Sequence, residues 1–206
     1  MKKTVMTPAN LTRRTVLALP LAAAALQGAN LPRPTPALKI PRPGGVPPID
    51  PAAHKGKVVA MFFLLTTCPH CKAFSRALTN VSKELGPLGF DVVAAAINDD
   101  TGRLVTGFVQ ETGATFPVGF VKQEVCNEYL QHPSMVTMYM PQLALIDRKG
   151  MIRYQHGGDD EKFFNDGENN LRKEVKLLLA EKATGGAPAA APKAAPKGKV
   201  PSEKGI

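Results

Sequence analysis

Two cysteines separated by two residues, Cys68 and Cys71, have the clearest capacity for chemistry in this chain. A thiolate is a nucleophile that attacks disulfide sulfur, and a second thiol three residues further along a helix lies on the same side. The second thiol can then close a small disulfide ring and release whatever the first has attacked. This spacing predicts thiol–disulfide exchange, with Cys68 as the attacking group and Cys71 as the resolving group.

Other uses of a Cys-x-x-Cys pair fit this sequence less well. A zinc site needs more ligands than this pair, but no second Cys-x-x-Cys or Cys-x-x-His follows. Cys126 and the scattered histidines are a poor source of the remaining zinc ligands. A c-type haem attachment needs histidine directly after the second cysteine, where Lys72 stands. A structural disulfide that closes so short a loop removes little chain entropy. No metal or organic cofactor is implied.

The residues around the pair predict a strand and a helix that position it. Residues 58–65 form an uninterrupted apolar run, typical of a strand buried on both faces of a central sheet. Thr67 is the expected N-cap of the following helix, and Pro69, which lacks an N–H, fits the first turn. We therefore expect Cys68 at a helix N-terminus, where unpaired N–H groups and the macrodipole favour a thiolate over a thiol.

Pro69 and His70, between the cysteines, are expected to tune the reactivity of Cys68. A positive charge on the His70 ring near the Cys68 sulfur would stabilise the thiolate and make the pair more oxidising. The alternative is that His70 is a solvent-exposed spacer.

Residues 66–74, with the sequence TTCPHCKAF, resemble the active site of the thioredoxin superfamily. The Pro-His pair is similar to that of DsbA-like thiol oxidases and of some TlpA-like proteins. Residues 140–158 resemble the TlpA-like and thioredoxin pattern in which a cis-proline, here Pro141, precedes a strand, a turn and a second strand, over residues 143–146, 147–150 and 151–155. The resemblance implies an α/β thioredoxin-like fold, with a central mixed sheet flanked by helices and the cis-proline loop packed against the cysteines.

The same resemblance implies how substrate is bound and where this chain departs from the family. Met140, beside Pro141, would expose backbone groups that pair with an extended substrate segment. Thr67 stands where a tryptophan is common, which predicts a more open rim around the first cysteine. Phe62 replaces the buried acid found six residues before that cysteine, so Cys71 needs another base or reacts more slowly.

The rest of the domain follows an α/β order. A buried strand is predicted at 90–98 and a second short one at 116–120; helices are predicted at 103–111, 122–130 and 168–182. The path between Cys71 and Pro141 is longer than in a minimal thioredoxin and resembles a TlpA-like insertion. Cys126 is expected to be a buried free thiol, and His132 and His156 to be loop or strand-end residues.

Residues 1–30 are predicted to be an export signal. Lys2 and Lys3 begin it, Arg13 and Arg14 precede a short apolar core, and the paired arginines suggest the twin-arginine route. That core is shorter than the roughly 20 residues of a membrane-spanning helix, which favours cleavage over anchoring. We therefore expect an exported protein in a periplasmic or other extracytoplasmic compartment, where disulfides persist.

Three further segments complete the predicted organisation. Residues 31–53 are rich in proline and are predicted to be a linker, 54–182 the thioredoxin-like domain, and 183–206 a disordered Ala/Pro/Lys tail. Residues 55–182 hold fifteen Lys and Arg against fifteen Asp and Glu, so the net charge of +9 lies in the flanking segments. With a neutral domain, nothing points to a nucleic-acid surface, and at most weak contact of the basic tails with anionic membranes is expected.

Together these features predict an exported thiol:disulfide oxidoreductase of TlpA-like type, acting on protein thiols and disulfides and recycled by a redox partner protein. A peroxiredoxin-like peroxidase is one alternative, but it needs a threonine three residues before the peroxidatic cysteine, where Leu65 stands. A non-enzymatic module that holds client proteins or copper through its thiols is the other.

Overall fold

The computed structural model describes residues 29–98 and 102–181 of the chain. The predicted tail, 183–206, and nearly all of the predicted export signal, 1–30, lie outside these residues. Within the described ranges, no helix combines the length and the apolarity needed to cross a bilayer.

A six-stranded mixed sheet forms the centre of the domain, with the strand order β1-β6-β5-β2-β3-β4. The strands are β1 Arg33–Pro34, β2 Val58–Leu64, β3 Phe90–Ala96, β4 Val118–Phe120, β5 Gln142–Ile146 and β6 Met151–His156. Strands β2, β3 and β4 run parallel, whereas β5 is antiparallel to β2, β6 to β5, and β1 to β6. The mixed sheet predicted from the sequence is confirmed.

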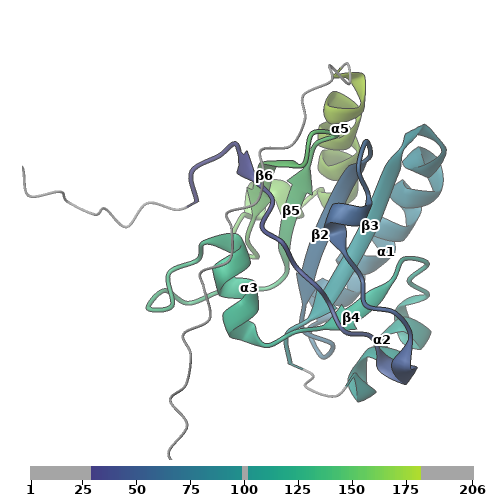
Figure 1. The fold of residues 1–206 in the computed structure, drawn as a ribbon, viewed down its shortest axis with the longest axis vertical. Helices are drawn as coiled ribbons and strands as arrows, with labels where there is room; N and C mark the ends of the chain where they lie inside the picture. The colour runs from purple at the N-terminus through teal and green to yellow at the C-terminus, as the bar shows by residue number, and fades with distance from the viewer. Residues whose placement is uncertain (1–28, 99–101, 182–206) are drawn as a thin grey trace, which may run out of the picture.

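Helices cover both faces of this sheet (Figure 1). They are α1 Pro69–Leu85, α2 Arg103–Thr112, α3 Gln123–Leu130, α4 Glu161–Phe164 and α5 Gly167–Ala180. Helices α1, α2, α4 and α5 contribute to the apolar cluster on one face, and α3 contributes to the cluster on the other. All of these helices except the short α4 were predicted from the sequence.

Strand β2 is the central element because both of its faces are buried. All seven of its residues are buried, and they alternate between the two apolar clusters. Val58, Ala60 and Phe62 face α1 and α5, while Met61 and Phe63 face α3. The continuous apolar run in the sequence follows from this two-sided burial.

Residues 31–53 are not the predicted linker, because they pack along the domain. Strand β1 pairs with β6, and further on the Phe120 N–H donates to the Pro41 carbonyl at 3.0 Å. Ile40 and Ile49 pair with each other through two backbone hydrogen bonds of 2.9 Å. In Figure 1 this purple segment crosses the sheet from the β6 edge towards β4.

Two physical reasons explain why a proline-rich segment packs in this way. Strand β1 lies at an edge of the sheet, where a proline without an N–H costs no interior ladder bond. Ile40 and Ile49 are 0 % and 6 % exposed and bury their side chains in the cluster on the α3 face. Gly119 allows the close approach, because a Cβ there would collide with the Pro41 carbonyl. The folded domain therefore begins near Arg33 instead of residue 54.

Ile40→Ala should lower the free energy of unfolding by about 2–5 kcal/mol, because it leaves a cavity in a closed apolar cluster. Urea denaturation measures this loss. Val46→Ala, at an exposed position of the same segment, is the control and should change stability by less than about 0.5 kcal/mol. Equal stability of Ile40→Ala and the unsubstituted protein would show that residues 31–53 are a linker after all.

Candidate active site

Cys68 is itself the N-cap of α1, in place of the predicted Thr67. The Cys71 N–H donates to Cys68 Sγ at 3.3 Å, and Pro69 is the first helical residue. A sulfur can accept from a first-turn N–H as a serine oxygen does, which makes a hydroxyl cap one residue earlier unnecessary. Thr67 instead lies exposed in the turn before the helix. The Cys68 sulfur is thus held at the positive end of the helix.

The two cysteines differ in exposure, and both are free thiols in this structure. Cys68 is partly exposed, whereas Cys71 is completely buried. Burial, and then the neighbouring Cys68, raise the pKa of the Cys71 thiol far above its ordinary value. Of the two sulfurs, Cys68 is therefore the one that an incoming protein can reach.

A pair of hydrogen bonds fixes the turn that leads into Cys68. The Thr66 N–H donates to Asn98 Oδ1 at 3.0 Å, and Asn98 Nδ2 donates to Thr66 Oγ1 at 3.1 Å. Asn98 follows the end of β3, so the amide ties the ends of the two central strands together. We did not predict this role for Asn98, because the predicted strand 90–98 included it, whereas β3 ends at Ala96.

The peptide bond between Met140 and Pro141 is cis, as the sequence resemblance implied. Pro141 is buried, and Met140 packs against both apolar clusters. The Gly158 N–H donates to the Tyr139 carbonyl at 3.0 Å, which ties the end of β6 to this segment. A Cβ at Gly158 would collide with the Met140 backbone, so glycine is required there. The close approach of the Met140 backbone thus explains why Gly158, the second of the two glycines after β6, is a glycine.

The cysteine turn and the cis-proline segment border one groove. Its volume is about 430 Å³, and it extends from the start of α1 to the start of α5. The lining residues are mostly apolar or small: Pro69, His70, Ala73, Phe74, Ala77, Pro141, Gly158, Phe164, Gly167 and Glu168. The structure thus brings together Pro69, His70 and Pro141, three of the residues predicted from sequence. The contributions of α4 and α5 were not predicted.

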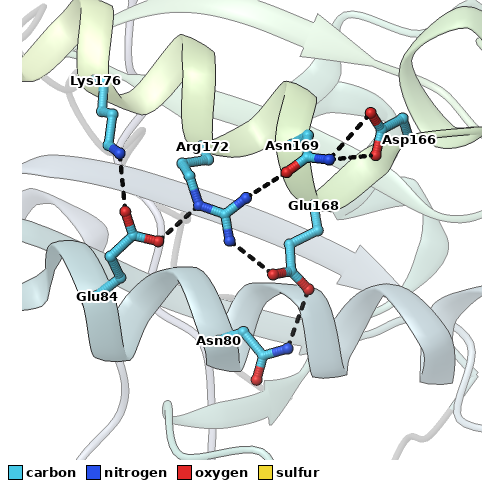
Figure 2. A network of polar contacts seen from close by, with 7 residues as sticks. All are labelled: Asn80, Glu84, Asp166, Glu168, Asn169, Arg172 and Lys176. Atoms are coloured by element: carbon cyan, nitrogen blue, oxygen red, sulfur yellow. Dashed lines mark hydrogen bonds and ion pairs between the residues drawn. The ribbon is translucent and has the colours of Figure 1, made fainter.

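A network of polar contacts holds the α5 wall of the groove against α1 (Figure 2). Arg172 donates to Glu84 at 2.6 Å and to Glu168 at 2.7 Å. Asn80 donates to the second oxygen of Glu168 at 3.0 Å, and Lys176 pairs with Glu84 at 2.9 Å. Each exposed pair contributes little alone, but several that converge on one arginine restrain the register of the two helices. The network also lowers the pKa of Glu168, through hydrogen bonds from Asn80 and Arg172, so this groove residue carries a negative charge.

His70 and Lys72 flank the second cysteine in different settings. The His70 ring is exposed at the groove and has no hydrogen-bond partner among the described residues. Lys72 forms an ion pair with Glu111 of α2 at 2.9 Å. The charge of Lys72 is thereby paired with the Glu111 carboxylate.

Cys126 lies on the other face of the sheet, in the cluster formed with α3. It is fully buried, and its sulfur lies 3.9 Å from the Met138 sulfur. Burial raises the pKa of its thiol, so the predicted buried free thiol is confirmed. Among the described residues, no three His, Cys, Asp or Glu side chains converge as metal ligands.

His156 is the last residue of β6, as predicted for a loop or strand-end residue, and its ring also contacts three other side chains. Its Nδ1 lies 2.8 Å from Asp160 and its Nε2 3.0 Å from Glu174, while its ring stacks on Phe163 with centroids 3.7 Å apart. Burial lowers the pKa of His156, but the hydrogen bonds with Glu174 and Asp160 outweigh it and raise the pKa above its ordinary value. The ring thus connects β6 to α4 and α5, which form one side of the groove.

Comparisons with known proteins agree with this architecture. A family model described as Redoxin matches residues 34–172. The fold resembles a thiol:disulfide interchange protein of the thioredoxin family from Chlorobium tepidum, with 22 % identity and a TM-score of 0.60 over 74 % of this chain and 99 % of that one. It also resembles the thioredoxin domain of a thiol-disulfide oxidoreductase from Bacteroides vulgatus, with 17 % identity and a TM-score of 0.57 over 75 % and 99 % of the two chains.

A third similar structure is a secreted disulfide oxidoreductase from Mycobacterium tuberculosis, homologous to E. coli DsbE. It shares 19 % identity, with a TM-score of 0.50 over 68 % of this chain and 96 % of that one. At these identities the likeness shows the fold, and the chain has the thioredoxin-like α/β fold predicted from sequence. No curated protein matches the chain in sequence.

Stability should depend on pH through His156. Because the folded protein binds this proton more tightly than the unfolded chain does, the stabilisation is complete below the ordinary histidine pKa of about 6.5 and is lost as pH rises through the raised value. The difference in unfolding free energy between the protein and His156→Gln should therefore be largest below the ordinary histidine pKa of about 6.5 and should shrink as the pH rises above it. Urea denaturation at a series of pH values measures it.

His70→Gln is the matched control, because that ring is exposed and has no partner among the described residues. Its effect on stability should stay near zero at each pH. A His156→Gln effect that is constant with pH would contradict the ion pairs described for His156.

Proposed function

This chain belongs to the Redoxin family, and we propose that it exchanges disulfides with protein thiols through Cys68 and Cys71. One observation carries the proposal: the reachable Cys68 sulfur caps a helix, while Cys71, one turn further on, is buried and donates its N–H to that sulfur. An exposed attacking thiol beside a protected resolving thiol is the arrangement that two-step exchange requires.

In the first step, the Cys68 thiolate attacks one sulfur of a substrate disulfide. The substrate S–S bond breaks, a mixed disulfide forms at Cys68, and the other substrate sulfur leaves as a thiolate. The helix N-terminus stabilises the attacking charge before this step.

In the second step, Cys71 gives up its proton and attacks the Cys68 sulfur of the mixed disulfide. The Cys68–Cys71 disulfide forms, the substrate leaves with one thiol and one thiolate that takes its proton from water, and two electrons have passed from this protein to the substrate. Phe62 occupies the position of the expected acid on β2 and packs on Phe74, so we assign the Cys71 proton to the departing substrate thiolate. The reverse sequence oxidises a substrate dithiol.

The groove beside Cys68 is the proposed contact surface for an extended segment of the substrate protein. Pro141 lines the groove, and the backbone of the Met140–Pro141 segment would pair with the substrate segment. Thr67, exposed in the turn before α1, would leave the approach to Cys68 open. His70, exposed at the same groove, would tune the charge near the Cys68 sulfur, and Pro69 fixes the start of the helix.

We also propose that the protein acts after export, in an extracytoplasmic compartment. The support is in the sequence: paired arginines, Arg13 and Arg14, precede a short apolar core near the N-terminus. One protein of similar fold is described as secreted. A redox partner protein would restore the starting state of the cysteine pair after each turnover.

Cys71→Ser should trap the mixed disulfide, because the intermediate at Cys68 then has no internal thiol to resolve it. Incubation with a disulfide-containing protein such as insulin should give a covalent adduct, seen by non-reducing electrophoresis and placed at Cys68 by mass spectrometry. Turnover of insulin by this variant should fall at least about a hundredfold, since loss of the resolving thiol removes the fast release step.

Cys68→Ser should form no adduct and show no turnover. Cys126→Ala changes a thiol on the other face of the sheet. This variant should turn over insulin as the unsubstituted protein does and should trap no adduct. Adduct formation by Cys68→Ser, or loss of turnover in Cys126→Ala with the fold intact, would contradict the assignment of the two roles.

A further inference from the structure

A second cavity, of about 360 Å³, lies at the end of the sheet opposite to Cys68. Val59 at the start of β2, Ile146 at the end of β5 and Met151 at the start of β6 all line it. Cys68 follows the other end of β2, a strand of seven residues, which spans roughly 20 Å. A ligand here would therefore stand clear of the redox chemistry.

Basic side chains gather around this cavity. The basic lining residues are His54, Lys55, Lys57, Arg148 and Lys149. The β5–β6 turn that carries two of them is held in shape by Asp147, whose Oδ1 accepts the N–H groups of Lys149 at 2.9 Å and Met151 at 3.0 Å. The cations are thus presented from a fixed turn and from the short segment before β2.

The positive charge exceeds what nearby acids neutralise. Asp91 pairs with Lys57 at 2.9 Å and lies 2.7 Å from His54, and Asp147 pairs with Arg153 on β6 at 3.1 Å. Lys55, Arg148 and Lys149 form no ion pair with any described residue. Residues 55–182 hold fifteen Lys and Arg against fifteen Asp and Glu, so this excess is local. Several cations that border one concave surface attract anions that carry more than one charge.

Two polar atoms of the lining residues also lack partners. Thr35 Oγ1 and Arg148 Nε are buried and form no hydrogen bond with a described residue. Buried donors are rarely left unsatisfied in native proteins, and a bound ligand is one of the ways in which they are paired. Thr35 belongs to the proline-rich segment, residues 31–53. This segment forms one wall of the cavity through Thr35, Pro34, Pro51 and Ala52.

The flanking segments of the chain do not suit this cavity by charge. Residues 1–32 carry four Lys and Arg and no acid, and residues 183–206 carry four Lys and Arg against one acid. Like charges repel, so an occupant must come from another molecule. Phosphate groups fit best, because they carry up to two charges in a compact shape and accept hydrogen bonds from lysine and arginine.

We propose that this cavity, bordered by Lys55, Arg148 and Lys149, binds phosphate groups of a small anion or of a lipid headgroup. The proline-rich segment closes one wall of the site, which gives residues 31–53 a role in binding as well as in stability. The inference is independent of the function proposed for Cys68 and Cys71.

Titration calorimetry of the full chain with pyrophosphate tests a free anion. Co-sedimentation with vesicles of phosphatidylcholine, with and without phosphatidylglycerol, tests a lipid headgroup. The double variant Lys55→Gln/Lys149→Gln removes two exposed cations that form no ion pair, so it should fold normally. We expect it to bind at least one of the two probes at least about tenfold more weakly, since each lost charge-assisted hydrogen bond costs about that factor.

Lys122→Gln/Lys173→Gln is the matched control, because it removes the same charge from exposed positions that do not line the cavity. It should bind as the unsubstituted protein does. Loss of pyrophosphate affinity specific to the cavity variant identifies a soluble phosphate ligand, and loss of vesicle binding alone identifies a lipid headgroup. Equal losses in both double variants, or no binding of either probe by the unsubstituted protein, would overturn the proposal.

Discussion

Burial of β2 on both faces is the constraint on which the rest of the structure depends. A strand closed in by two apolar clusters cannot shift its register without moving every side chain to the wrong face. The point at which the chain leaves the sheet is therefore fixed, and Cys68 follows only a short turn later. Asn98, at the end of the neighbouring strand, fixes that turn through its two hydrogen bonds with Thr66.

The same burial separates the roles of the two cysteines. Pro69 starts α1 directly after Cys68, so the first sulfur stays at the helix end while Cys71 turns inward against the core. The Cys68 side chain is thus partly exposed, whereas the Cys71 side chain is buried. The cis-proline segment and α5 then complete a groove whose walls are held by the Arg172 network and by His156.

Much of this arrangement could be predicted from sequence because it rests on local patterns. Three of these patterns determine the structure within a few residues of themselves: the apolar run before Cys68, the proline after it and the Met140–Pro141 motif. The packing of residues 31–53 could not be predicted in this way, because Ile40 and Ile49 are isolated apolar residues without a period among prolines. The contacts of His156 and Arg172 join residues far apart in sequence, so they required the fold. The N-cap of α1 is Cys68 and not Thr67, a shift of one residue that depends on the geometry of the turn before the helix.

The equilibrium between the dithiol and disulfide forms of the Cys68–Cys71 pair, followed in glutathione buffers, measures the central property most directly. A redox-active pair should give a single two-electron transition with a potential between about −270 mV, as in thioredoxin, and about −120 mV, as in DsbA. Mass spectrometry should place the disulfide between Cys68 and Cys71 and leave Cys126 reduced. Absence of that disulfide throughout the range would contradict a role of these cysteines in thiol–disulfide exchange.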